Sequence, residues 1–244
     1  MNIKIDSNSR IGEIVKNNYK TAEVFKKYNI DFCCGGDQTI FNACLDIELQ
    51  ADELIAELLN KNNQPGDVDR NYKDWTVDFL AKYILNIHHA YIKENIPILV
   101  ELTNKIANRH GSLHPELFFV NVNFLKVAEE LQLHMMKEER ILFPYIIKLY
   151  EAYNNSLEMD KPAFGTIANP IKMMEEEHEE AGNLLGEIRK ITNDFMLPDD
   201  ACNSYAITFK KLDEFENDLH LHIHLENNIL FPDSIELERK YFER

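Results

Sequence analysis

The 244-residue sequence is poor in the residues that interrupt helices, with only eight glycines and eight prolines. This scarcity favours an all-helical protein, because glycine and proline are the least favourable residues inside a helix. No apolar run approaches the roughly 18 residues that a membrane-spanning helix needs. The first residues also lack the apolar core of a signal peptide. We therefore expect a cytoplasmic protein with no membrane partner.

Basic residues are also few, because 26 lysines and arginines face 42 aspartates and glutamates, which gives a formal net charge of -16. Such a charge repels the phosphates of nucleic acids and of anionic membranes, so no nucleic-acid partner is expected. The chain has four cysteines. A disulfide framework is not expected in the cytosol. Two of the cysteines, Cys33 and Cys34, are adjacent and need a separate interpretation.

One segment of the sequence occurs twice, at 134–144 and at 222–232, and both copies read H-x-x-x-E-x-x-x-L-F-P. A histidine and a glutamate four residues apart lie on the same face of a helix, one turn from each other. A single histidine precedes each copy, with His89 45 residues before the first and His178 44 residues before the second. This internal repeat predicts two structurally equivalent halves.

The repeated residues fall on the apolar stripes of four predicted helices. Apolar residues recur every three or four positions across 85–106, 124–145 (including Ile141), 171–188 and 212–229. This pattern is typical of the core of an antiparallel four-helix bundle. Six stripe positions carry polar residues where leucine or isoleucine is expected: His89, His134, Glu138, His178, His222 and Glu226. Buried charged groups are usually paired or bound to metal.

These six residues predict a site for two metal ions. Imidazole and carboxylate ligands suit iron, manganese and zinc, and six ligands exceed the four of a tetrahedral zinc site. The set divides into two metals with two histidines each, bridged by Glu138 and Glu226, as in di-iron and di-manganese bundles. We predict two iron ions joined by an oxo or hydroxo group, with a position open for a small ligand. The alternative is a buried hydrogen-bond network, which does not need the duplicated spacing.

Several neighbouring residues compete with these ligands. His88 lies on a weaker apolar stripe than His89, so His89 is preferred. His220 and His224 point away from the apolar seam of their helix and are expected at the surface. Glu177 borders a ligand turn, where it could relay protons or charge, but it is also expected at the surface.

The pattern changes along the chain and predicts two domains. Residues 1–60 contain short helical patterns around Cys33 and Cys34, and residues 74–244 contain the bundle. Residues 61–73 are polar and include a Pro-Gly pair, which indicates a linker. A core as small as that of 1–60 is marginally stable alone. We therefore expect it to lean on the bundle or on a second copy of itself in a homodimer.

These motifs resemble the RIC family (repair of iron centres), the di-iron proteins of the YtfE and ScdA type, with a hemerythrin-like domain. The resemblance rests on Phe-Cys-Cys-Gly-Gly at 32–36, on both copies of the repeat, and on Glu-His-x-Glu-Ala-Gly at 177–182. Phe32 differs from the tyrosine that the family often has. The resemblance implies that the six stripe residues ligate two irons, with Glu138 and Glu226 bridging.

The resemblance also implies a role under nitrosative and oxidative stress. Family members are associated with repairing damaged iron–sulfur clusters by supplying iron, and with reducing nitric oxide to nitrous oxide at the di-iron site. Damaged iron–sulfur proteins are then the expected partners, and nitric oxide or oxygen is the expected small ligand. The alternative function is that of a hemerythrin-like protein that binds or senses oxygen or nitric oxide. The symmetric four-histidine set and the added cysteine domain argue against this alternative.

The resemblance identifies Cys33 and Cys34 as the vicinal cysteines of the family's amino-terminal domain. Exposed thiols beside Gly-Gly could take up nitric oxide, hold released iron or pass electrons. The alternative is that the two cysteines are buried as small apolar residues.

Overall fold

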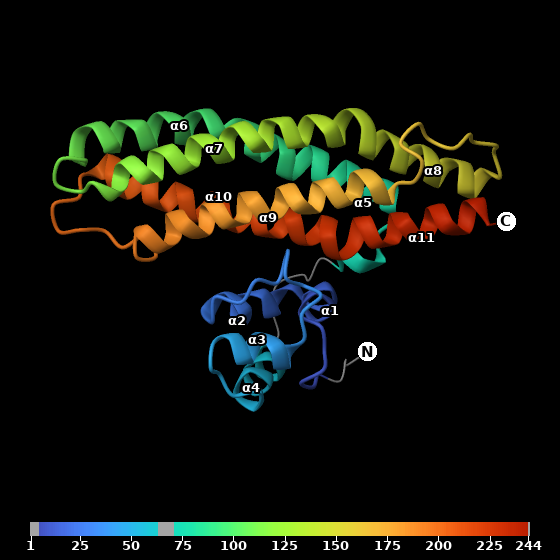
Figure 1. Ribbon diagram of the computed structural model, residues 1–244, viewed down its shortest axis with the longest axis horizontal. Coiled ribbons are helices and arrows are strands. Elements are labelled where there is room, and N and C mark those ends of the chain that lie inside the picture. The colour runs from blue at the N-terminus through green and yellow to red at the C-terminus, as the bar shows by residue number, and fades with distance from the viewer. Residues whose placement is uncertain (1–4, 63–70, 244) are drawn as a thin grey trace.

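The computed structural model describes residues 5–62 and 71–243. Within these ranges the chain is built from helices and turns, with one isolated bridge between Arg10 and Thr39. Figure 1 shows a long bundle of helices with a small amino-terminal unit packed beneath it. The predicted all-helical fold is therefore confirmed. No helix in the described part of the chain is long and apolar enough to cross a membrane.

The amino-terminal unit contains four short helices: α1 (Ile11–Asn17), α2 (Ala22–Lys27), α3 (Ile40–Asp46) and α4 (Ala51–Asn62). Its buried residues, such as Phe25 and Leu54, belong to the same apolar cluster as Phe215 of the bundle. The unit therefore leans on the bundle of its own chain. Of the predicted linker 61–73, residues 63–70 lie outside the described residues.

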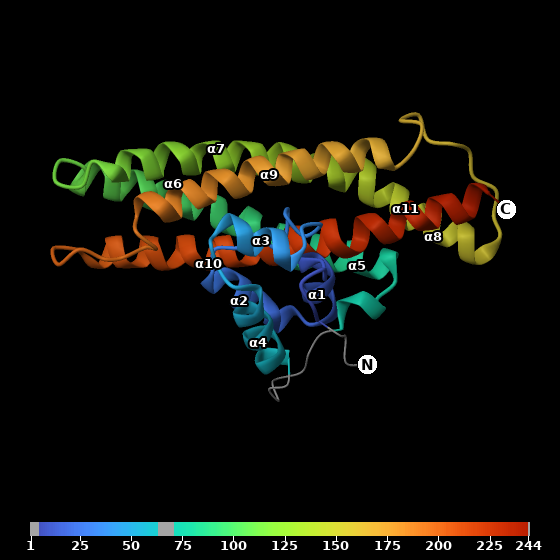
Figure 2. The ribbon, with the colours of Figure 1, turned by 60° about the horizontal axis from the view of Figure 1, so that its bottom comes forward.

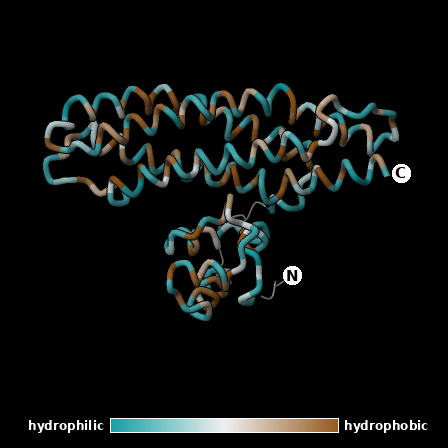
Figure 3. The backbone as a smooth tube through the Cα atoms, in the orientation of Figure 1, coloured by the Kyte–Doolittle hydropathy of each residue, from teal (hydrophilic) through white to brown (hydrophobic). Residues whose placement is uncertain are grey.

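The bundle consists of four long helical rods, which Figures 1 and 2 show lying side by side. Their segments are α5 (Val77–Ile84) with α6 (Ala90–His110), α7 (Glu116–Lys137) with α8 (Phe143–Asn155), α9 (Ala168–Ile191), and α10 (Asn203–Leu225) with α11 (Phe231–Phe242). Figure 3 shows hydrophobic residues alternating with hydrophilic ones along each rod, as the apolar stripes predicted.

The apolar interior of the bundle is divided into two clusters. One is formed by α6, α7, α10 and the later half of α9, together with the amino-terminal unit. The other is formed by α5, α8, α11 and the first turns of α9. The six predicted metal ligands belong to neither cluster and lie where the rods pass from one to the other.

Three rods contain a turn of π-helix at this level: Leu85–His89, Glu138–Leu142 and Glu226–Leu230. A π turn contains one residue more than an α turn, so the face that points inward shifts by one position after it. After Glu138 the buried residue is therefore Leu142, whereas Ile141 is 52% exposed. The prediction that Ile141 lies on the core stripe was wrong, because that stripe assumed an unbroken α-helix.

Two glycines allow the amino-terminal unit to approach the bundle closely. The Gly12 N–H in α1 donates a hydrogen bond to the Gly36 carbonyl at 2.8 Å. A Cβ on either glycine would overlap Oδ1 of Asn228, which lies between them. The Nδ2 of Asn228 donates to the carbonyls of Phe32 and Cys33, both at 3.3 Å. The Cys33–Cys34 loop is thus held on the turn that follows α10.

This contact predicts opposite effects for two glycine-to-alanine changes in helices. Alanine is ordinarily more favourable than glycine inside a helix by about 1 kcal/mol. Gly12→Ala should nevertheless lower the free energy of unfolding by about 1–3 kcal/mol, because the added methyl overlaps Asn228. Gly182→Ala in α9 is the matched control, since no described atom outside the adjacent residues and the local helix backbone lies within 4 Å of its Cβ position, and it should raise stability. Denaturant unfolding measures both, and wild-type stability of Gly12→Ala would contradict the close contact.

Candidate metal centre

The structure brings all six predicted ligands together in the bundle interior, where each is buried. Their ligand atoms form two clusters, each with all atoms within 4.8 Å of one another. One cluster contains His89 and His222, and the other contains His134 and His178. The two glutamates, Glu138 and Glu226, belong to both clusters. The repeat thus folds into two equivalent groups that share their carboxylates.

The local helix geometry places these side chains. Each His-x-x-x-Glu pair spans one turn, so that Nε2 of His134 lies 3.2 Å from Glu138 Oε2, and Nε2 of His222 lies 3.0 Å from Glu226 Oε1. Glu138 and Glu226 are each the first residue of a π turn. His89 is the last residue of the remaining π turn, Leu85–His89. Such turns are frequent at functional sites because they redirect side chains within a helix.

The buried atoms of the centre have the chemistry of a candidate cation site. The oxygens of Glu138 and Glu226 make no well-oriented hydrogen bond among the described residues, although imidazole Nε2 atoms lie 3.0–3.3 Å from them. Nε2 of His89 and of His222 likewise lacks a well-oriented hydrogen bond. The Nε2 atoms of His134 and His178 face each other at 3.0 Å. A buried carboxylate without partners costs several kcal/mol unless an opposite charge compensates it. A metal cation bound among these six side chains would satisfy all of these atoms.

The carboxylates also set the charge state of the histidines. Burial lowers the pKa of His134, but the nearby carboxylates of Glu138 and Glu177 outweigh burial and raise that pKa to about 10. Burial alone would raise the pKa of Glu226, but His222 and His178 bring it well below its usual value. Without a cation, a proton on His134 therefore offsets part of the carboxylate charge, whereas burial lowers the pKa of His222. A metal that binds here displaces a proton, because its ligands bind in their deprotonated form.

Three of the four histidines are held from outside by a hydrogen bond at Nδ1. The partners are Glu139 Oε1 for His89 (2.9 Å), Glu177 Oε2 for His134 (2.9 Å) and Asn227 Oδ1 for His178 (2.8 Å). Such bonds fix the tautomer and leave Nε2 free to bind metal. The surface prediction for Glu177 was wrong in part, because it is half-buried against His134.

Glu139 and Asn227 were not singled out from the sequence. A signal was nevertheless present, because each directly follows the shared glutamate of its repeat. The residue at this position thus orients the single histidine of its half: Glu139 orients His89, and Asn227 orients His178.

His222 differs from the other three histidines. Its Nδ1 has no hydrogen-bond partner within the described ranges, and its ring stacks on that of His88 at 5.8 Å. His88 is buried and its Nδ1 lies 3.1 Å from Asp218 Oδ1. The cluster member is His89, the residue that its stronger stripe favoured.

The surface prediction for the two histidines that flank His222 was wrong for His224. This residue is buried against Tyr19 and Phe32 of the amino-terminal unit. His220 is partly exposed and contacts the edge of Phe32 at 6.0 Å between ring centroids. The docked unit covers this face of α10, which the bundle pattern alone did not indicate.

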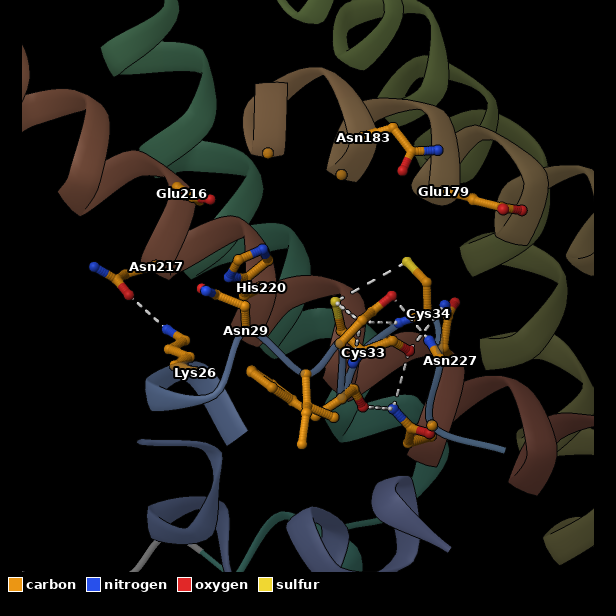
Figure 4. Close-up of a pocket in the computed structure, with 18 of the residues that line it drawn as sticks. Lys26, Asn29, Cys33, Cys34, Glu179, Asn183, Glu216, Asn217, His220 and Asn227 are labelled. Carbon is orange, nitrogen blue, oxygen red and sulfur yellow. Dashed lines mark hydrogen bonds between the residues drawn. The ribbon is translucent and has the colours of Figure 1, made fainter. Parts of the chain in front are cut away.

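The structure places Cys33 and Cys34 outside the two His/Glu clusters, with their sulfur atoms 4.0 Å apart. Cys33 is buried, whereas Cys34 is partly exposed and lines a cleft of about 1600 Å³ between the amino-terminal unit and α9 and α10 (Figure 4). Cys33 thus matches the alternative of a buried small residue, whereas Cys34 matches the alternative of an exposed thiol.

The carboxylate of Asp31 organises this loop. It accepts hydrogen bonds from the N–H groups of Cys33 (2.8 Å), Cys34 (3.0 Å) and Gly35 (3.0 Å). The hydrogen bond with Cys34, burial and the Asp31 charge together raise the pKa of the Cys33 thiol well above its usual value. Cys33 is therefore held as a protonated thiol.

Comparisons with known proteins agree with this geometry. Residues 80–233 match the hemerythrin HHE cation binding domain, and residues 7–62 match ScdA_N, a domain of unknown function. The iron-sulfur cluster repair protein YtfE of Dickeya chrysanthemi is 34% identical over 226 residues, which cover 91% of this chain and 94% of the relative. YtfE of Escherichia coli O81 is 36% identical with the same coverage. The chain therefore belongs to the family of the YtfE iron-sulfur cluster repair proteins, as the Cys-Cys-Gly-Gly segment and the repeated motif predicted.

Proposed function

We propose that the centre binds two iron ions, one between His89 and His222 and the other between His134 and His178. The observation that supports this proposal is that Glu138 and Glu226 belong to both clusters and can bridge two ions. Imidazole and carboxylate ligands without thiolate suit iron. Helical bundles hold paired metals with this type of ligand set. An oxo or hydroxo bridge between the ions stays a prediction.

The function that this site supports best is repair of damaged iron–sulfur clusters by donation of iron. The relatives that match 91% of the chain are named iron-sulfur cluster repair proteins. The ligand set and the vicinal cysteines are both present, and Cys34 faces an open cleft. Thiolates are the ligands that iron has in clusters, so a cysteine at the cleft suits transfer of iron to a client protein. Damaged iron–sulfur proteins are the proposed partners.

Reduction of nitric oxide is a second proposed activity, favoured by the proximity of the two clusters. Two ferrous ions held by these six side chains would supply the two electrons that, with two protons, convert two nitric oxide molecules into nitrous oxide and water. The protein holds the ligands with outer partners at Glu139, Glu177 and Asn227, which keep each Nε2 directed inward.

Repair can be tested on an iron–sulfur hydratase whose cluster has been destroyed by nitric oxide. We expect the iron-loaded protein to restore most of its activity under anaerobic conditions, because the centre supplies iron to the damaged cluster. The controls are the same protein stripped of iron by a chelator, and an equal amount of free ferrous iron. Equal recovery with free iron alone would contradict a repair function.

A further inference from the structure

The two halves of the repeat differ directly after the shared glutamate, where the first has Glu139 and the second has Asn227. Both residues accept a hydrogen bond from Nδ1 of the single histidine of their half, Glu139 from His89 and Asn227 from His178. The position therefore has the same role in both halves. The chemistry differs, because a carboxylate only accepts hydrogen bonds whereas an amide also donates them.

The side-chain NH2 group of Asn227 donates a hydrogen bond to the amino-terminal unit. Its Nδ2 donates to the backbone carbonyl of Cys33 at 3.3 Å while its Oδ1 accepts from His178 at 2.8 Å. Figure 4 shows Asn227 beside Cys33 and Cys34, joined to the loop by a dashed line. A single side chain thus contacts both a proposed iron ligand and the backbone of the cysteine pair.

The neighbouring Asn228 holds the same loop without contacting a metal ligand. It donates to the carbonyls of Phe32 and Cys33, and its Oδ1 lies between Gly12 and Gly36. The two asparagines therefore divide two tasks. Both dock the loop, but only Asn227 also orients a histidine of the centre.

We propose that Asn227 is a positioning residue that couples docking of the Cys33–Cys34 loop to retention of iron on the His178 side of the centre. This inference rests on the proposed iron centre. In the docked state the Cys33 carbonyl fixes Asn227, whose oxygen then holds His178 with Nε2 directed at the metal. When the loop leaves, Asn227 loses this support and His178 is held less firmly.

The coupling acts in both directions, because a change in affinity between two sites is reciprocal. Iron that fixes His178 also fixes Asn227 and favours the docked loop. Departure of the loop weakens iron binding at the same time as it exposes the cysteines. Release of iron and presentation of the thiols therefore occur together.

The test uses the burial of Cys33, a residue that is 5% exposed in the docked loop. In a Cys34→Ser background, alkylation of Cys33 by iodoacetamide reports departure of the loop and is followed by peptide mass analysis. Iron content is measured first, and the rate is then compared between iron-loaded and iron-stripped protein. We expect iron to slow alkylation about five- to tenfold, which lies at the lower end of typical coupling between sites.

Two variants in this background separate coupling from simple docking. Asn227→Asp keeps an acceptor for His178 but has no donor for Cys33, so the effect of iron on alkylation should disappear. Asn228→Ala is the matched control, and it should speed alkylation with and without iron while the effect of iron persists. An iron effect of wild-type size in Asn227→Asp would overturn the coupling alone. Absence of iron from the parent after reconstitution would overturn the proposed iron centre and the coupling with it.

Discussion

Replacement of both Glu138 and Glu226 by alanine will abolish iron binding, whereas the wild-type protein will hold about two ions per chain, as paired-metal bundles do. Both clusters contain both glutamates, so the double variant removes the carboxylates that the two proposed ions would share. The remaining histidines belong to two separate pairs and no longer have a carboxylate to join them. Metal analysis of anaerobically purified and reconstituted protein measures the loss.

The matched control replaces exposed glutamates on the same two helices, in the variant Glu129→Ala/Glu214→Ala. These side chains point away from the interior, so iron content should stay at the wild-type level. Far-UV circular dichroism establishes that both variants keep their helices. If the Glu138→Ala/Glu226→Ala protein still bound two irons, the paired motif would not be the metal site.

Replacement of both Cys33 and Cys34 by alanine will abolish cluster repair but leave iron content and nitric oxide turnover with an artificial reductant unchanged. The reason is spatial, because the two thiols lie outside the two proposed iron-binding clusters and Cys34 faces the cleft where a client protein can approach. The comparison of repair and turnover in one preparation separates iron donation from nitric oxide reduction.

Cys202→Ala is the control for this prediction. Cys202 lies at the start of α10, where its sulfur contacts His110, and it should be dispensable for both activities. Two outcomes would contradict the role of the vicinal pair: full repair by the Cys33→Ala/Cys34→Ala protein, or loss of its iron. The second outcome would mean that the thiols help to hold the centre.

The sequence was sufficient to predict the bundle and to identify six candidate ligands, because polar residues on an apolar stripe are conspicuous when they recur at equal spacing. The structure brings these six side chains together. The sequence did not predict that Ile141 is exposed, because a π turn changes which residues point inward without any change in the amino-acid composition of the helix. His224 was misplaced for another reason. Its burial depends on Tyr19 and Phe32, which are distant in the chain and contact it only after the amino-terminal unit docks.

The outer partners of the histidines show a similar limit. Glu139 and Asn227 occupy equivalent positions in the repeat, but a glutamate and an asparagine next to a glutamate also fit an exposed helix face. Both residues lie within a π turn, which changes the direction of their side chains from that in an α-helix. Their hydrogen bonds to the histidines depend on this change. Only the three-dimensional arrangement therefore shows that one of them also reaches Cys33.

The division of the bundle into two apolar clusters has a consequence for its unfolding. Burial of apolar side chains makes each apolar cluster cooperative within itself, but the layer between the two clusters contains six buried ionisable side chains. Regions joined by few apolar contacts can open as separate units with their own free energies. A metal bound to side chains from all four rods would join the two regions, so we expect metal-loaded protein to unfold in one step and metal-free protein to unfold in two.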